Sequence, residues 1–400
     1  MAAGVNASGR ARVFLRTGRD GPVRGGNPWI FSQAIARVEP ADAAPGTIAS
    51  IVNSGGDLLG LGYLNLTTTI AVRMLAWGEA PELDALVARR IDAALALRHR
   101  VVANDTDCYR LINGDGDGLS GIVVDRYGDT LVVQLLTAGA DRMRELLVRE
   151  LSRVIAPRAI IERSIGAVRK QEGLADRAAL LAGDSVGGIV VSENGIRIFV
   201  DFEHGQKTGY FLDQRENRNL AGSLAAGATV LDACCYGGGF ALAALKGGAT
   251  GAVAVDTSAR ALEWAQRNFE LNSFDTSHVE FVHDEAARFM AATDRRFDLI
   301  VLDPPPLARS RADAERAGRL YVELNALAMR VLAPGGRLLT FSCSAHFRGD
   351  DFIRAARIAA SKSSRPLRML AHLGPGRDHP VLLGHAEGEY LTGLLLADLG

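Results

Sequence analysis

Hydrophobic and polar positions follow three successive patterns along the 400 residues of the chain. Between residues 10 and about 78, short apolar runs such as "RVFL", "GTIASIVNS" and "LLGLGYLN" are separated by glycine, proline and asparagine. Apolar runs of strand length bounded by turn residues predict a small β-barrel, which we assign to residues 1–80.

The second pattern covers residues 81–190 and mixes helical with strand-like spacing. The segment "ELDALVARRIDAALALRHRVV" repeats apolar residues at helical intervals and predicts an amphipathic helix. A hairpin is then predicted from "CYRLINGDGDGLSGIVVDRYGDTLVVQLL", a helix from "ADRMRELLVRELSRVI" and a strand from "AIIERS". Asp115 and Asp117 could begin a calcium loop, but Leu119 occupies the next ligand position, so a turn is predicted and no metal site. This part of the chain predicts a small α+β domain.

The third pattern begins at "IRIFVDF" and continues to the end of the chain. Apolar strands such as "TVLDACC", "GAVAVD" and "FDLIVLDPP" alternate with helical segments such as "ARALEWAQRNFELN". This alternation predicts an α/β domain with a doubly wound, mostly parallel sheet over residues 191–400. The whole chain is therefore expected to hold three domains.

Composition and charge narrow the class of protein. The chain is 48% hydrophobic, contains no apolar run near the eighteen or so residues of a membrane span, and begins without the apolar segment of a secretory signal. Four cysteines without a C-x-x-C spacing indicate neither a disulfide framework nor a zinc site. We therefore expect a cytoplasmic protein with reduced thiols and no membrane partner.

A net charge of −1 gives no overall attraction to nucleic acid. However, "RARVFLRTGRDGPVR" holds five arginines, including Arg12 and Arg16, against the single acid Asp20. Such a patch could contact phosphates, or it could be a solvated surface; the residues alone leave both interpretations open.

Acidic residues stand at the ends of four successive strands in the C-terminal half, where doubly wound sheets bind their ligands. Gly237 and Gly239 belong to a glycine turn that follows the first strand, and Asp256, which ends the second, could accept both ribose hydroxyls. These two features fit a dinucleotide enzyme and a methyltransferase equally.

The remaining acids separate the two classes. Asp232 would repel a diphosphate but suits the cationic S-adenosylmethionine, and "YGGGFA" lacks the G-x-G-x-x-G spacing. Asp284 could contact an adenine amino group, and Asp303 begins an Asp-Pro-Pro sequence at the edge of the pocket. We therefore expect S-adenosylmethionine as the cofactor rather than a nicotinamide.

Cys343 ends the strand after Asp303, in "TFSCSAHF". A lone strand cysteine is more often a core residue, but this one lies in a polar "SCS" that stops an apolar run at the ligand-binding edge. Cytosine C5 is a poor nucleophile, and a thiolate that adds to C6 activates it. The base must then be single-stranded or flipped out of a helix.

Rival functions remain open at this point. Asp303-Pro304-Pro305 could serve N-methylation of an RNA base without covalent catalysis, although Leu307 stands where a stacking aromatic would be expected. A non-catalytic RNA-binding protein of the same fold is a second rival, and a nicotinamide dehydrogenase is a more distant third.

Taken together, "HGQKTGYFLDQRENR", "YGGGFA", "VDTSARALEWAQRN", "FDLIVLDPP", "LLTFSCS" and "RDHPVLLGHAEGEYLTG" resemble the RlmI-type large-subunit ribosomal RNA (cytosine-5) methyltransferases. "NPWIFSQAI" resembles their N-terminal PUA domain, and "YRLINGDGDGLSGIVVDRYGD" their middle domain. The resemblance covers nearly the whole chain and implies a PUA-like RNA-binding barrel, a middle α+β domain and a class I methyltransferase domain. It also implies formation of 5-methylcytosine in 23S ribosomal RNA with S-adenosylmethionine.

The resemblance further implies roles for particular residues. Cys343 would be the nucleophile and Asp303 the acid beside it. The positions expected to bind the cofactor are Gln214, Asp232, Gly237, Gly239, Asp256, Asp284 and Asp303. Those expected to contact ribosomal RNA are Arg12, Arg16, Lys207 and Tyr210. Homodimer formation is left open.

Overall fold

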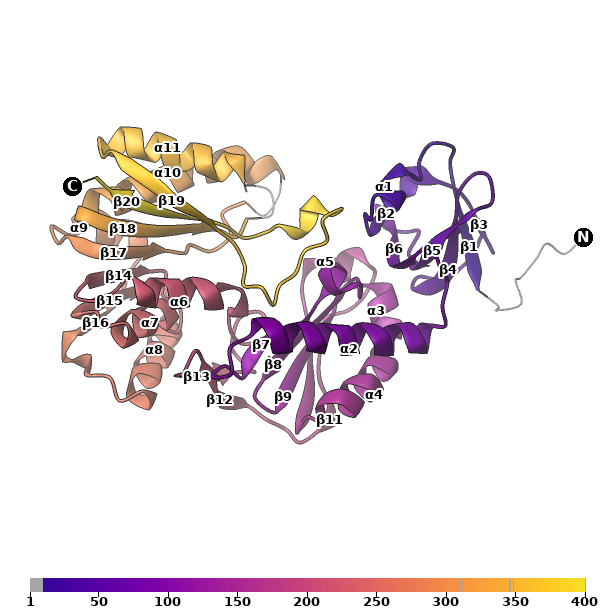
Figure 1. Ribbon diagram of the computed structural model, residues 1–400, viewed down its shortest axis with the longest axis horizontal. Helices are drawn as coiled ribbons and strands as arrows, with labels where there is room; N and C mark the ends of the chain where they lie inside the picture. Colours follow the sequence, from indigo (N-terminus) through magenta and orange to yellow (C-terminus); the bar gives the residue numbers. More distant parts are fainter. Residues whose placement is uncertain (1–9, 309–310, 345–346, 348, 400) are drawn as a thin grey trace, which may run out of the picture. The chain divides into compact units, whose positions relative to one another are not determined.

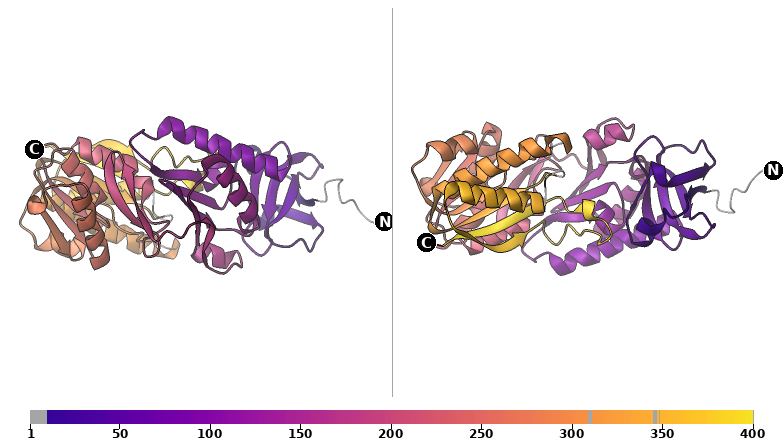
Figure 2. Two further views of the ribbon diagram at one scale, coloured as in Figure 1. Left: turned by 90° about the horizontal axis from the view of Figure 1, so that it is seen from below. Right: turned by 90° about the horizontal axis from the view of Figure 1, so that it is seen from above.

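The computed structural model describes residues 10–308, 311–344, 347 and 349–399 (Figure 1). Its elements form two compact units, and each unit is assembled from separate stretches of the chain. Unit 1 comprises Met1–Gly187, Asp201–Tyr210 and Arg377–Gly388, and unit 2 comprises Gly188–Val200, Phe211–Gly376 and Glu389–Gly400. Two further views are drawn in Figure 2.

The N-terminal part of unit 1 is a six-stranded sheet around its own core. In spatial order its strands are β2 (Trp29–Phe31), β6 (Ile70–Trp77), β5 (Leu58–Leu64), β4 (Thr47–Val52), β1 (Ala11–Leu15) and β3 (Ile35–Glu39). The sheet is antiparallel except for the β1–β4 pair, and α1 (Gly21–Arg24) precedes β2. Alternate side chains such as Val13, Ile51 and Leu64 are fully buried because they face one apolar core.

The second part of unit 1 is a five-stranded sheet with helices packed on it. In spatial order its strands are β11 (Arg177–Gly183), β10 (Ala159–Ser164), β9 (Thr130–Leu135), β8 (Ile122–Tyr127) and β7 (Cys108–Asn113). Its helices are α2 (Leu83–Val101), α3 (Ala138–Arg142), α4 (Arg144–Ile155) and α5 (Ala167–Gln171). Apolar faces of α2 and α4, including Ile91 and Leu151, share one core with these strands. The single helix predicted over 140–155 is divided at Met143.

The segment Arg377–Gly388 returns to unit 1 late in the chain. The guanidinium of Arg98, which is fully buried, donates to the carbonyl of Asp378 (2.7 Å) and pairs with Asp117 (2.6 Å). The amide of Arg110 donates to the Asp378 carboxylate (2.9 Å). These contacts join residues far apart in sequence within a single unit.

Unit 2 is a doubly wound sheet of seven strands. In spatial order these are β16 (Val279–His283), β15 (Gly251–Asp256), β14 (Thr229–Ala233), β17 (Phe297–Leu302), β18 (Leu332–Ser342), β20 (Thr392–Asp398) and β19 (Leu367–Leu373). The first five are parallel, and β20 and β19 are antiparallel additions. A separate hairpin, β12 (Gly188–Glu193) and β13 (Ile196–Asp201), donates hydrogen bonds to Asn268 of α8 (Ala259–Leu271) and to Asn272, which caps that helix.

Helices cover both faces of this sheet. One face packs against α9 (Ala286–Ala292), α10 (Ala314–Val331) and α11 (Asp350–Ser363) in a core that includes Met290, Tyr321 and Phe352. α7 (Gly239–Lys246) and α8 (Ala259–Leu271) pack on the other face, with α6 (Arg215–Ser223) beside α7. The fold class is therefore the expected one. Among the described residues, none of the helices combines the length and apolar character needed to cross a bilayer.

Candidate active site

Four acids and one cysteine lie in order along one edge of the unit 2 sheet, where the parallel strands end. Asp256 pairs in register with His283, the residue before Asp284, and Ala233, the residue after Asp232, pairs with Val255 and Leu302. The strand order therefore sets out the edge residues as Asp284, Asp256, Asp232, Asp303 and Cys343. The alternating sequence pattern was sufficient to predict this alignment.

The turn after β14 holds its backbone in an unusual conformation. Cys234 (φ 67°), Tyr236 (φ 49°) and Gly238 (φ 73°) all have left-handed backbones, which is costly for the two residues that carry side chains. The turn is secured because the Tyr236 amide donates to Asp256 Oδ2 (2.8 Å) and Asn268 Nδ2 donates to the Gly237 carbonyl (3.0 Å). A strained, firmly held turn beside the acids is typical of a ligand site.

The Asp256 carboxylate accepts two hydrogen bonds from backbone amides of the protein. Oδ2 accepts from Tyr236, and Oδ1 accepts from the Ser258 amide (2.8 Å). Because an ionised carboxylate has about four acceptor positions, each oxygen retains one for a further donor. Asp284, one strand away, accepts from the Glu285 amide (2.8 Å) and pairs with Arg288 (3.1 Å).

Asp232 is a fully buried carboxyl inside β14, one residue before the strand ends. Its Oδ2 accepts from the Ala241 amide (3.0 Å), while Oδ1 is buried without a hydrogen-bond partner among the described residues. The pKa of Asp232 is raised to about 7, mainly by burial and also by the neighbouring Asp303 and Asp256, while the bond from the Ala241 amide lowers it. Such an orphaned buried oxygen fits a cationic ligand group.

Cys343 follows β18 directly and lies beside the loop that follows β17. Its side chain is partly exposed, and Sγ lies 3.7 Å from the Pro304 carbonyl oxygen. Asp303, also partly exposed, is held to β14 because its amide donates to the Ala233 carbonyl (3.3 Å). The thiol and the carboxyl therefore follow the ends of two neighbouring strands, β18 and β17, at one edge of the sheet.

The other cysteines lie in different environments. Burial raises the pKa of both Cys234 and Cys235 well above the usual value, and nearby acids add to this effect. Cys234 and Cys235 therefore stay protonated near neutral pH. Cys108 is fully buried in unit 1.

Gln214 lies in unit 2, in the turn Leu212–Gln214 before α6, and only 2% of its surface is exposed. Its Oε1 accepts from Asn217 Nδ2 (2.6 Å), which also donates to the Gly374 carbonyl (3.0 Å). The turn is close to the glycine turn through an edge-to-face contact between Phe211 and Tyr236, whose ring centroids are 5.1 Å apart.

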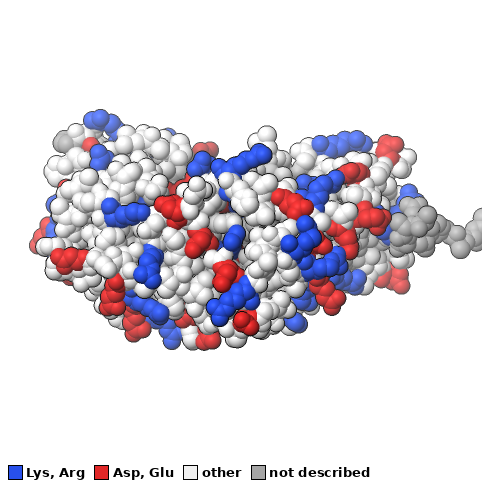
Figure 3. Space-filling view, turned by 60° about the horizontal axis from the view of Figure 1, so that its bottom comes forward, with Lys and Arg blue, Asp and Glu red and all other residues white. Residues whose placement is uncertain are grey.

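The four residues predicted to contact RNA all lie in unit 1. Arg16 and Lys207 are exposed, whereas the Arg12 guanidinium lies 4.7 Å from the centre of the Phe14 ring. Tyr210 is only 4% exposed and its amide donates to Tyr127 Oη (3.2 Å), so its ring offers little surface to a ligand in this structure. On the face drawn in Figure 3, basic and acidic side chains are interspersed.

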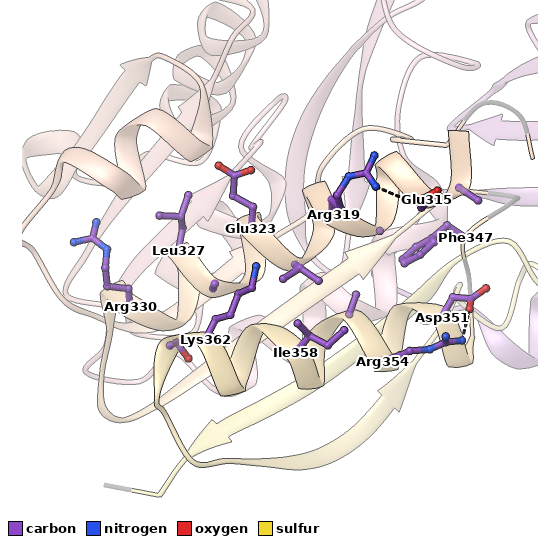
Figure 4. Close-up of a pocket in the computed structure, with 16 residues that line it drawn as sticks. Glu315, Arg319, Glu323, Leu327, Arg330, Phe347, Asp351, Arg354, Ile358 and Lys362 are labelled. Atoms are coloured by element: carbon purple, nitrogen blue, oxygen red, sulfur yellow. Dashed lines mark hydrogen bonds and ion pairs between the residues drawn. The ribbon is translucent and has the colours of Figure 1, made fainter. Parts of the chain in front are cut away.

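A groove of about 1010 Å³ lies away from the strand-end acids, between α10 and α11 (Figure 4). Val322, Leu327 and Ile358 form part of its apolar lining, and Arg319 and Arg354 pair with acids on their own helices. In the described part of the chain its lining includes neither Cys343 nor the acids of the sheet edge.

Two polar residues near the site were missed by sequence reasoning. Asn268, 1% exposed in α8, binds both the glycine turn and β13. Tyr321, fully buried in α10, contacts Ser342 and Ser344 on either side of Cys343. Each occupies an apolar position of an amphipathic helix, and that mismatch was the available signal.

Comparison with known proteins agrees with the fold and the edge geometry. Residues 117–370 match the model of the S-adenosylmethionine-dependent methyltransferases, and residues 13–77 match a PUA-like domain. A proposed S-adenosylmethionine-dependent methyltransferase from Streptococcus mutans has the same fold (TM-score 0.81, 21% identity, 96% of this chain and 99% of that chain). A second proposed methyltransferase, solved in complex with S-adenosylhomocysteine, superposes with a TM-score of 0.83 at 22% identity, over the same shares of the two chains. The protein is an S-adenosylmethionine-dependent methyltransferase.

Sequence relatives define the family more closely. The protein of Erwinia tasmaniensis named ribosomal RNA large subunit methyltransferase I is 38% identical over 388 residues, which cover 96% of this chain and 98% of the relative. Its namesake from Aeromonas hydrophila is 38% identical over 394 residues, 96% of this chain and 99% of the relative. The chain belongs to the ribosomal RNA large subunit methyltransferase I family.

Proposed function

We propose that the protein transfers a methyl group from S-adenosylmethionine to C5 of a cytosine in large-subunit ribosomal RNA. The RNA substrate is supported by the names of relatives that match almost the full chain and by the PUA-like domain. The choice of cytosine C5 depends on one observation above all: a partly exposed thiol, Cys343, lies at the edge of a methyltransferase sheet beside Pro304, the residue after Asp303.

The acids of the edge are proposed to hold the cofactor. Asp232 suits the positively charged methionine end, because its buried Oδ1 has no hydrogen-bond partner among the described residues. The remaining acceptor positions of Asp256 suit the two ribose hydroxyls, and Asp284 suits the adenine amino group. Gly237 and Gly239 give the backbone close access, and Gln214 remains a predicted contact of the methionine end.

The Cys343 thiolate adds to C6 of a single-stranded or flipped cytosine, so the C5–C6 electron pair becomes available at C5. C5 takes the methyl group that S-adenosylmethionine supplies, and the C–S bonding pair stays on the departing thioether sulfur. Loss of the C5 proton to a base then restores the double bond and releases the Cys343 thiolate. Asp303 is proposed to hold the N3 edge of the base.

The test combines a map of the RNA with a cysteine variant. Ribosomal RNA from cells with and without the gene should differ by a 5-methylcytosine in the large subunit, read by nucleoside mass spectrometry. Cys343→Ser should abolish turnover while leaving affinity for S-adenosylmethionine unchanged by calorimetry. Cys108→Ser, which changes a buried thiol of unit 1, tests whether loss of another thiol matters and should retain turnover.

Amino-methylation of an RNA base is the second candidate, because Asp303-Pro304-Pro305 lies at the same edge. It predicts full activity in Cys343→Ser and no 5-methylcytosine in the map. The same two measurements therefore separate the candidates.

A further inference from the structure

A cluster of three buried hydroxyl groups lies directly behind the proposed nucleophile. Ser342 and Ser344 flank Cys343, and both contact the hydroxyl of Tyr321 on α10 at 3.0 Å. All three residues have no measurable exposure. Buried hydroxyls in such a network are satisfied only in one arrangement, so they fix the groups to which they bind.

Ser344 connects the end of β18 to the loop that carries Asp303. Its Oγ accepts from the amides of Leu307 (3.0 Å) and Ala308 (3.2 Å). Because a hydroxyl oxygen has two acceptor lone pairs, these amides occupy both, and the Ser344 proton is directed to Tyr321 Oη. Ser344 Oγ thus holds the part of this loop that contains Leu307 and Ala308 to the end of the cysteine strand.

Tyr321 in turn orients both serines. Ser342 Oγ donates to the Phe347 carbonyl oxygen (2.8 Å) and lies 3.0 Å from Tyr321 Oη. The Tyr321 ring is itself held by Phe347, stacked at 5.1 Å with an 8° angle between planes, and by Phe352, edge-on at 5.4 Å. The hydroxyl therefore occupies a fixed position.

We propose that Tyr321 is a positioning residue that keeps the Asp303 loop in register with the Cys343 thiol through Ser344 and Ser342. The inference rests on the proposed function, because it assigns the network a purpose in covalent catalysis. Asp303 follows β17 and Cys343 follows β18. The chain between them includes the whole of α10, so it does not fix their relative positions. A displacement of about 1 Å between reacting groups costs about a hundredfold in rate.

The experiment compares Tyr321→Phe with Thr340→Val. The first removes the hydroxyl and retains the stacked ring. The second removes a fully buried hydroxyl from β18, the strand that contains Ser342. This hydroxyl has no hydrogen-bond partner among the described residues. Tyr321→Phe should slow single-turnover methylation by about tenfold to a hundredfold, with unchanged affinity for S-adenosylmethionine, and Thr340→Val should retain the wild-type rate.

Two protein-level measurements accompany the rates. Amide hydrogen exchange at Leu307 and Ala308 should accelerate in Tyr321→Phe, and more strongly in Ser344→Ala, which removes the acceptor itself. Trapping with RNA that contains 5-fluorocytidine, from which the C5 substituent cannot be eliminated, should yield less adduct per unit time in both variants. A wild-type rate or wild-type exchange in Tyr321→Phe would overturn the inference.

The wild-type protein alone tests the proposed function. If the wild-type protein forms no 5-fluorocytidine adduct, the covalent mechanism is wrong. If the wild-type adduct forms and Tyr321→Phe forms it equally fast, only the positioning role is wrong. A loss of rate accompanied by an equal loss of cofactor affinity would also overturn it, since that pattern indicates general disruption of the site.

Discussion

Replacing Asp232 by asparagine should stabilise the cofactor-free protein and weaken cofactor binding at the same time. The carboxyl is fully buried, and one of its oxygens has no hydrogen-bond partner among the described residues. Asparagine keeps the shape and an acceptor for the Ala241 amide but cannot carry the negative charge. Stability and function are therefore expected to move in opposite directions.

The magnitude follows from the shift in pKa. Burial moves the pKa of Asp232 from 3.8 to about 7 in the folded protein. A folded state that binds the proton more tightly loses stability relative to the unfolded chain as the pH rises from 3.8 through 7. At about 1.36 kcal/mol per pH unit, the free energy of unfolding falls by roughly 4 kcal/mol over this window. Asp232→Asn should recover up to that amount at pH 8 and almost nothing at pH 4.

Binding of a cationic cofactor must reverse the protonation. Between pH 5 and pH 7 the wild-type dissociation constant for S-adenosylmethionine should fall about tenfold per unit, because Asp232 has to lose its proton. Calorimetry at pH 6 in two buffers of different ionisation enthalpy should detect the release of about one proton. Asp232→Asn should show weaker binding and no proton release from this site.

The matched control is Asp294→Asn, which changes an exposed acid that precedes β17 at the opposite edge of the sheet. It should alter neither unfolding nor binding. Wild-type affinity that is independent of pH between 5 and 7, or an Asp232→Asn protein that binds as tightly as wild type, would refute the reasoning.

Two other changes should lower stability by amounts that the contacts define. Asn268→Ala removes the acceptor of the Phe199 amide and the donor to the Gly237 carbonyl, so urea unfolding should show a loss of roughly 2–3 kcal/mol; an unchanged midpoint would contradict a role in holding the glycine turn. Arg98→Met leaves the buried Asp117 carboxylate without its partner, and the unfolding free energy should fall by about 3–5 kcal/mol, whereas Arg89→Met, at an exposed pair on the same helix, should change it by less than about 1 kcal/mol.

The sequence predicted the sheet edge because alternating strands and helices bring strand ends together. Asp256 and Asp303 could be aligned from their positions after apolar runs alone. Asp232 interrupts the apolar run of β14, and the sequence pattern did not indicate that this acid is fully buried. The contact between Tyr321 and Ser344 spans 23 residues, and no local pattern specifies which buried hydroxyls will meet.

Three other features of the fold were not predicted from the sequence. The family resemblance implied that Tyr210 contacts RNA, whereas its side chain is only 4% exposed and its amide donates to Tyr127 Oη. The division of the predicted helix at Met143 is a local effect of packing that apolar spacing does not encode. The antiparallel strands β19 and β20 were not among the strands predicted from the sequence.

The late return of Arg377–Gly388 has a consequence for biosynthesis. Arg98 and its acceptor Asp378 are 280 residues apart, so at about 5–20 residues per second the ribosome needs roughly 14–56 s to supply the second after the first. During that interval the newly made N-terminal half holds a guanidinium whose final environment does not yet exist. Maturation of unit 1 therefore waits for translation to be almost finished, and an expression fragment that stops at residue 187 would lack part of its own interior.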